Sequence, residues 1–89
     1  MKLRVAMGHT ARIIRQQKNY TLRQLSESSG ISLAHLSEFE RGIKEMSSEL
    51  LTSLASGLQI NQSDIILEAY RIISKEEQRE AKRVARSTN

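Results

Sequence analysis

The chain has 89 residues and a formal net charge of +4, which fits one domain with a single core. Apolar residues make up 38% and charged residues 27%, as in folded globular proteins and unlike disordered ones. The absence of cysteine excludes disulfides, thiolate metal sites and cysteine nucleophiles. Because no apolar run approaches the roughly 20 residues of a membrane span, we expect a cytoplasmic protein without membrane contact.

Positive charge is concentrated at the two ends of the chain. Residues 1–42 contain seven basic and three acidic side chains, residues 43–73 two and four, and residues 74–89 five and three. The three aromatic residues, Tyr20, Phe39 and Tyr70, are too few for a platform that stacks single-stranded bases. We therefore expect an electropositive face in the N-terminal half.

The first predicted helix runs from about Leu3 to Lys18, with Gly8 as a weak point. Its expected inward face repeats every three or four residues and consists of Leu3, Met7, Ala11, Ile14 and the stem of Lys18.

The next two predicted helices are short and are separated by a glycine turn. Residues 22–28 follow Thr21, which with Gln24 forms a capping box. Gly30 suits the left-handed position after that helix. Residues 33–41 follow Ser32 as N-cap, and the expected inward residues of the pair are Leu22, Leu25, Ile31, Leu36 and Phe39.

A fourth helix is predicted after Ser47 and a fifth after Asn61. The apolar stripe of the fifth consists of Ile65, Ile66, Ala69, Tyr70 and Ile73. From Ser74 the sequence is charged all round, so we expect a helical extension that frays before Asn89. The predicted organisation is an all-α domain over residues 1–73 and a charged extension over residues 74–89.

Residues 21–42 carry the functional signal. Two short helices joined by a tight turn must cross steeply, so the second projects from the body of the domain. A projecting helix about 10 Å across matches the width of the DNA major groove. This arrangement favours a helix-turn-helix that binds duplex DNA.

The stretch Thr21–Ser32, followed by Leu36-Ser37-Glu38-Phe39-Glu40-Arg41-Gly42, resembles the Cro/repressor-type (XRE) helix-turn-helix family. Residues 40–51, Glu-Arg-Gly-Ile-Lys-Glu-Met-Ser-Ser-Glu-Leu-Leu, resemble more narrowly the Clp gene regulator (ClgR) group of bacterial transcription factors. The resemblance implies a five-helix, repressor-like domain that binds operator DNA as a dimer and reads it with the third helix.

For this chain, the resemblance implies that the third helix lies in the major groove of DNA and that residues near it contact phosphates. The expected base-contact residues are Leu33, Ala34, His35, Ser37 and Glu38. The expected phosphate-contact residues are Thr21, Arg23, Ser32, Arg41 and Lys44. Leu33 and Ala34 stand where many family members have Gln or Arg, which favours contacts with thymine methyl groups over bidentate hydrogen bonds.

Several of these residues also have ordinary structural interpretations. The resemblance implies that Arg15 and Glu40 pair and hold the reading helix, although both would serve as surface charges. Glu38 is either an acceptor for cytosine N4 or a solvated side chain. His35 has no neighbouring ligands for a metal, so we expect no metal site and no cofactor.

The fifth helix has more apolar residues than one small core can absorb. We therefore expect a homodimer through Ile66, Tyr70 and Ile73. The function indicated is a sequence-specific transcriptional regulator, and the ClgR resemblance implies activation of Clp protease and proteostasis genes, with RNA polymerase as a candidate partner. No small-molecule ligand is expected. The alternative is a protein-interaction module, such as an antitoxin or a bridging coactivator. We do not expect an enzyme, because the sequence contains no recognisable constellation of catalytic residues.

Overall fold

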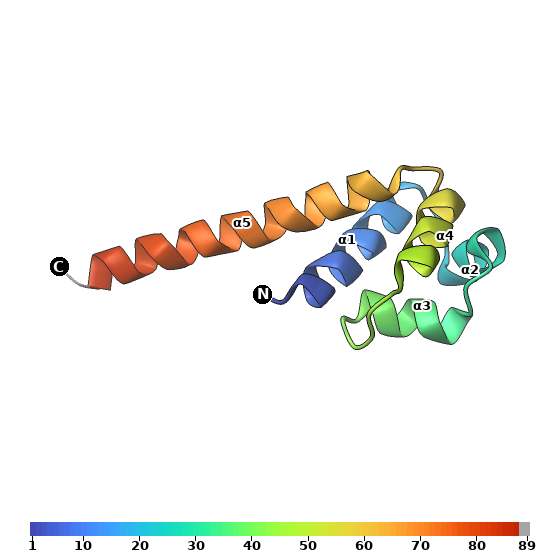
Figure 1. Ribbon diagram of the computed structural model, residues 1–89, viewed down its shortest axis with the longest axis horizontal. Helices are drawn as coiled ribbons and strands as arrows, with labels where there is room; N and C mark the ends of the chain where they lie inside the picture. The colour runs from blue at the N-terminus through green and yellow to red at the C-terminus, as the bar shows by residue number, and fades with distance from the viewer. Residues whose placement is uncertain (88–89) are drawn as a thin grey trace.

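The computed structural model describes residues 1–87, the side chain of Ser87 excepted, and contains the five expected helices (Figure 1). They are α1 (Leu3–Gln17), α2 (Leu22–Ser29), α3 (Leu33–Glu40), α4 (Ser48–Leu58) and α5 (Gln62–Ser87). No strand occurs in this range, so the all-α prediction is confirmed. The molecule measures 54 × 23 × 22 Å because α5 continues far beyond the other helices.

Helices α2, α3 and α4 each begin at a residue whose hydroxyl caps them, and α2 ends at a glycine. Thr21 and Gln24 form the full capping box at the start of α2, with bonds of 3.0 and 2.8 Å. The hydroxyls of Ser32 and Ser47 each accept a bond from the backbone N–H three residues later. Gly30 ends α2 at φ +74°, a left-handed conformation that glycine adopts without a Cβ penalty.

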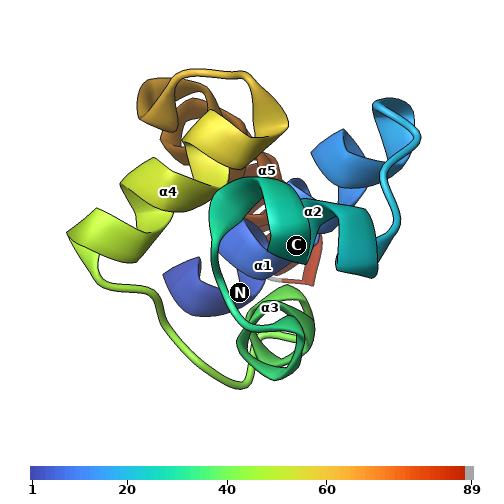
Figure 2. The ribbon, with the colours of Figure 1, turned by 90° about the vertical axis from the view of Figure 1, so that its right-hand side faces the viewer.

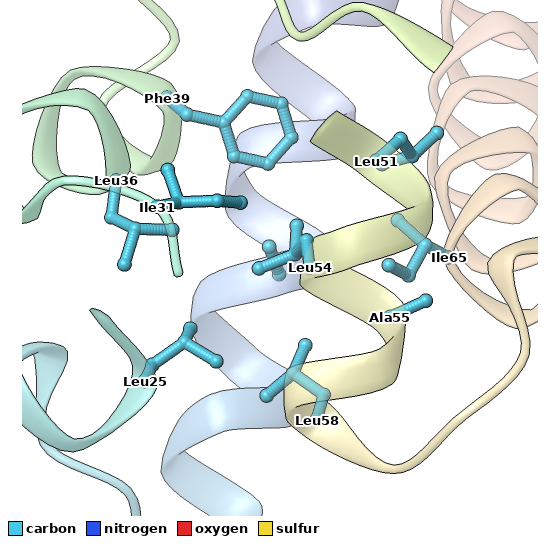
Figure 3. Close-up of a cluster of buried hydrophobic side chains, with 10 residues drawn as sticks. Leu25, Ile31, Leu36, Phe39, Leu51, Leu54, Ala55, Leu58 and Ile65 are labelled. Carbon is cyan, nitrogen blue, oxygen red and sulfur yellow. The ribbon is translucent and has the colours of Figure 1, made fainter. Parts of the chain in front are cut away.

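The core lies where α1 to α4 and the start of α5 converge, and Figure 3 shows its side chains meeting from these helices. The fully buried members with the largest side chains are Phe39, Leu25, Leu36, Leu54, Leu58 and Ile65. The inward positions expected for α2 and α3 are thus correct, with Leu22 only partly buried.

The prediction for the buried side of α1 is correct in part: Ala11 is fully buried and Met7 and Ile14 pack against the core, whereas Leu3 is 56% exposed and Lys18 is exposed. The other buried positions are the small residues Ala6, Gly8 and Thr10. The reason is that α1 lies between α3 and α5 and contacts both. A Cβ on Gly8 would lie 2.0 Å from the carbonyl oxygen of Phe39, so Gly8 is required for the close approach to α3.

Helix α5 is a single helix that passes through Ser74 without a break. The fraying expected near Asn89 lies outside the described residues. Ile65 and Ala69 are fully buried, whereas residues 77–86 are exposed throughout. Among the residues that the structure describes, no helix has both the length and the apolar character needed to cross a membrane.

Candidate nucleic-acid interface

The turn between α2 and α3 is fixed by apolar packing and by local hydrogen bonds. Leu25 and Leu36 have no exposed surface, and Ile31 in the turn has 3%. The hydroxyl of Ser26 donates a 2.6 Å bond to the carbonyl oxygen of Ile31, and the backbone N–H of Gly30 donates to the carbonyl oxygen of Ser26. The position of α3 relative to α2 is therefore well defined.

Helix α3 lies at the edge of the domain, with one side on the core and the other free (Figure 2). The expected base-contact residues occupy the free side and its border. Leu33 is 43% exposed and Ala34 is exposed, while Ser37 and Glu38 are half-buried. His35 lies on the flank, half-buried, with Nε2 3.5 Å from the carbonyl oxygen of Glu45.

The expected phosphate-contact residues are all exposed: Thr21, Arg23, Ser32, Arg41 and Lys44. Two of the cations among them already have local partners. Arg41 Nε donates a long 3.4 Å bond to the carbonyl oxygen of Ser37, and Lys44 Nζ lies 3.8 Å from Glu38 Oε2. Both partners are on α3, so these cations lie directly beside the face that is expected to contact bases.

Backbone N–H groups at the exposed starts of α2 and α3 offer further contacts for anions. The hydroxyls of Thr21 and Ser32 are used as caps, yet both lie at exposed helix N-termini. Such N-termini favour anions because unpaired N–H groups and the helix dipole act together. The face therefore combines apolar and polar contacts in its centre with cationic and N–H groups at its border.

An ion pair between Arg15 on α1 and Glu40 on α3 holds α3 against the body of the domain. Arg15 Nε donates to Glu40 Oε2 at 2.7 Å and Nη2 donates to Oε1 at 3.0 Å. A third bond, 2.8 Å long, joins Nη1 to the carbonyl oxygen of Tyr20. The side chains are 12% and 5% exposed, so the pair is largely shielded from water.

The electrostatics of this pair are consistent with its geometry. The hydrogen bond to Glu40 raises the pKa of Arg15, burial lowers it, and the charge of Glu40 raises it further, with a net increase. Arg15 therefore stays charged, as a bidentate carboxylate partner requires.

The residues expected at a dimer contact lie on the side of α5 that faces away from the core. Tyr70 is 64% and Ile66 46% exposed, while Ile73 is half-buried. Leu67 is also 46% exposed beside them and was missed, because it lies off the helical stripe that pointed to the others. Within residues 1–87, no group of three or more His, Cys, Asp or Glu side chains is placed to hold a metal ion.

A projecting second helix, a tight glycine turn and a cationic border define a helix-turn-helix DNA-binding domain. The profile of the helix-turn-helix family matches residues 12–61, and the chain belongs to this family. It is 38% identical over 86 residues to the transcriptional regulator ClgR of Mycobacterium tuberculosis, a match that covers 97% of the chain and 72% of that relative.

Solved structures agree with the family assignment. The crystal structure of the clp gene regulator ClgR from Corynebacterium glutamicum matches 100% of this chain and 96% of its own, with 39% identity and a TM-score of 0.85. The restriction-modification controller protein C.AhdI from Aeromonas hydrophila matches 68% of this chain and 92% of its own, with 26% identity and a TM-score of 0.67. The chain is thus a helix-turn-helix transcriptional regulator of the ClgR-like type.

Proposed function

We propose that the protein binds a specific duplex DNA sequence by placing α3 in the major groove. The observation that carries this proposal is the free face of α3, which is bordered by exposed cations and fixed from behind by the Arg15–Glu40 pair. Base contacts come from Leu33, Ala34, His35, Ser37 and Glu38, and phosphate contacts from Thr21, Arg23, Ser32, Arg41 and Lys44.

The central contacts favour thymine and cytosine. Leu33 and Ala34 offer apolar surface for a thymine methyl group, and Glu38 can accept a hydrogen bond from cytosine N4. Lys44, 3.8 Å from Glu38, would turn to a phosphate and leave the carboxylate free for the base. DNA binding then exchanges a weak surface ion pair for two contacts with the duplex.

The regulator acts as a homodimer on a two-fold-related operator. Tyr70, Ile66, Leu67 and the half-buried Ile73 supply an apolar surface on α5 that a second copy would cover. Two reading helices about 34 Å apart would enter successive major grooves on one side of the duplex. Similarity to the clp gene regulator supports Clp protease and proteostasis genes as targets in the cytoplasm, with RNA polymerase as a partner in activation and no catalytic role for the protein.

Selection of bound duplexes from a random pool tests the proposal. We expect one enriched motif with two-fold symmetry, in which the half-sites are separated by about one helical turn. No enrichment, together with salt-sensitive binding to every sequence, would contradict sequence-specific recognition. A stable complex with a different protein would then favour the interaction module that the same fold can also support.

The oligomeric state is tested by replacing exposed apolar residues of α5. The variant Ile66→Glu with Tyr70→Glu should fold, because both side chains are exposed, and should sediment as a monomer that binds the operator weakly. Leu3→Glu is the matched control, since Leu3 is an exposed apolar residue on another helix. A wild-type monomer at high micromolar concentration, both free and on its operator, would contradict the dimer.

A further inference from the structure

The C-terminal part of α5 extends beyond the body of the domain. Residues 77–87 continue α5 for about 16 Å past Glu76 at 1.5 Å per residue. Every described side chain from Glu77 to Arg86 is exposed. In Figure 1 this part of α5 points away from the other four helices. It has no role in the core, so its charges require another explanation.

The side of α5 that α1 covers is marked by four positions. Ile65 and Ala69 are fully buried, and Ile72 lines a groove together with Thr10 of α1. Glu76 Oε1 lies 2.6 Å from the α-amino nitrogen of Met1. These positions are spaced by four, three and four residues, which keeps them on one side of an α-helix.

The same spacing continues into the exposed part of α5. Three and four residues alternate again from Glu76 to Arg79, Arg83 and Arg86. These arginines and Lys82 also line one shallow depression on the helix. We call Arg79, Lys82, Arg83 and Arg86 the basic overhang. Its three arginines continue, past the Met1–Glu76 pair, the side of α5 that α1 covers.

That side of α5 is the side on which the reading helix lies. Helix α1 contacts both α5 and α3, and it lies between them in Figure 1. A duplex held against the free face of α3 would therefore pass along the side to which the overhang points. The acids on or beside this side are all paired: Glu68 with Arg71, Glu76 with the α-amino group of Met1, and Glu80 with Arg83.

We propose that the basic overhang contacts phosphates of the duplex that α3 reads, at a second position along the DNA. The inference rests on the proposed function, since it uses the same duplex. Arginine suits phosphate because its planar fork donates two parallel hydrogen bonds. Arg79 and Arg86 are about 10 Å apart along the helix, which is close to the rise of three base pairs at about 3.4 Å each.

These contacts would act on affinity and on salt dependence and would leave base preference unchanged. The overhang offers no groove-reading geometry, and phosphate contacts position a protein without carrying sequence information. The pair between Arg83 and Glu80 is exposed, so exchanging it for a phosphate contact costs little.

Two variants of the full chain test the proposal. The first, Arg79→Gln with Arg83→Gln and Arg86→Gln, removes three charges. The second interchanges neighbours, Gln78→Arg with Arg79→Gln and Ala85→Arg with Arg86→Ala. The interchanged chain has the same composition and net charge as the wild type, but two cations are rotated by about 100° around the helix. All of these residues are exposed, and thermal melts confirm that each variant folds.

Binding to the selected operator is measured by fluorescence anisotropy over a range of salt concentrations. Each lost phosphate contact should make the negative slope of log K against log salt shallower by about 0.9 unit. The slope should therefore become shallower by about 3 units in the first variant and by about 2 units in the interchanged variant. A wild-type slope in the first variant would overturn the proposal. A wild-type slope in the interchanged variant alone would also overturn it, because net charge would then account for the effect.

The two proposals fail in different ways. If the wild type shows no preference for any sequence, specific recognition by α3 is wrong, and the slope comparison can still be made on an arbitrary duplex. If the selected motif is the same in all three proteins but the slopes do not differ, recognition by α3 stands and only the overhang contact is wrong.

Discussion

Removing either partner of the Arg15–Glu40 pair should destabilise the domain severely. The guanidinium makes three hydrogen bonds of 2.7 to 3.0 Å, and Glu40 is only 5% exposed. Glu40→Ala would leave the cation of Arg15 shielded from water without its carboxylate, which costs about 3–5 kcal/mol. A folded chain of this length holds about 4–13 kcal/mol in total, so the variant should lose a large part of its stability.

Urea unfolding followed by circular dichroism measures this loss as a change in the free energy of unfolding. Arg15→Lys keeps the charge but loses the fork, so its loss should be smaller than that of Arg15→Ala. The double variant Arg15→Met with Glu40→Leu replaces the pair by apolar side chains and should recover much of the loss. If both alanine variants unfold within about 0.5 kcal/mol of wild type, as surface substitutions do, the pair does not stabilise the fold.

Three further predictions concern α1 and the interface. Gly8→Ala should lower the free energy of unfolding by about 1–3 kcal/mol, because its Cβ would overlap the carbonyl oxygen of Phe39; a thermal melt that rises with the better helix propensity would contradict the close approach. Arg23→Gln or Lys44→Gln should reduce the salt slope by about one unit each for all sequences, and an unchanged slope would remove them from the phosphate contacts. Ala34→Gln or Glu38→Gln should change which base pairs are selected, with a change in binding free energy of about 1–3 kcal/mol for each affected base pair. An unaltered motif would show that other residues contact the bases.

Helix boundaries were predictable because they depend on local chemistry. Thr21, Ser32 and Ser47 cap the next helix through their own hydroxyls, and Gly30 ends α2 through its own backbone. The buried positions of α1 were predictable only in part, since they depend on which helices lie beside α1. Leu3 fits an amphipathic pattern, yet it is exposed at the start of α1, and small residues further along the helix take the buried positions.

The candidate site also has features that the sequence predicts and features that depend on the tertiary structure. Exposure of Ala34 and burial of Leu36 follow from the period of one short helix. The distance between Lys44 and Glu38 depends on how the chain leaves α3, which the sequence pattern does not specify. The overhang was visible only as a charged run, because the direction of its arginines depends on the register between α5 and α1.

Because α5 is one unbroken helix, a small tilt at its anchored end produces a larger displacement at its far end. Its 26 residues span about 39 Å, so a tilt of about 5° at the core would move the last turn by about 3 Å. Small changes in packing around Ile65 and Ala69 are therefore enlarged at Arg86. A regulator built on one rigid rod can thus couple its core packing to the placement of charges that lie far outside the core.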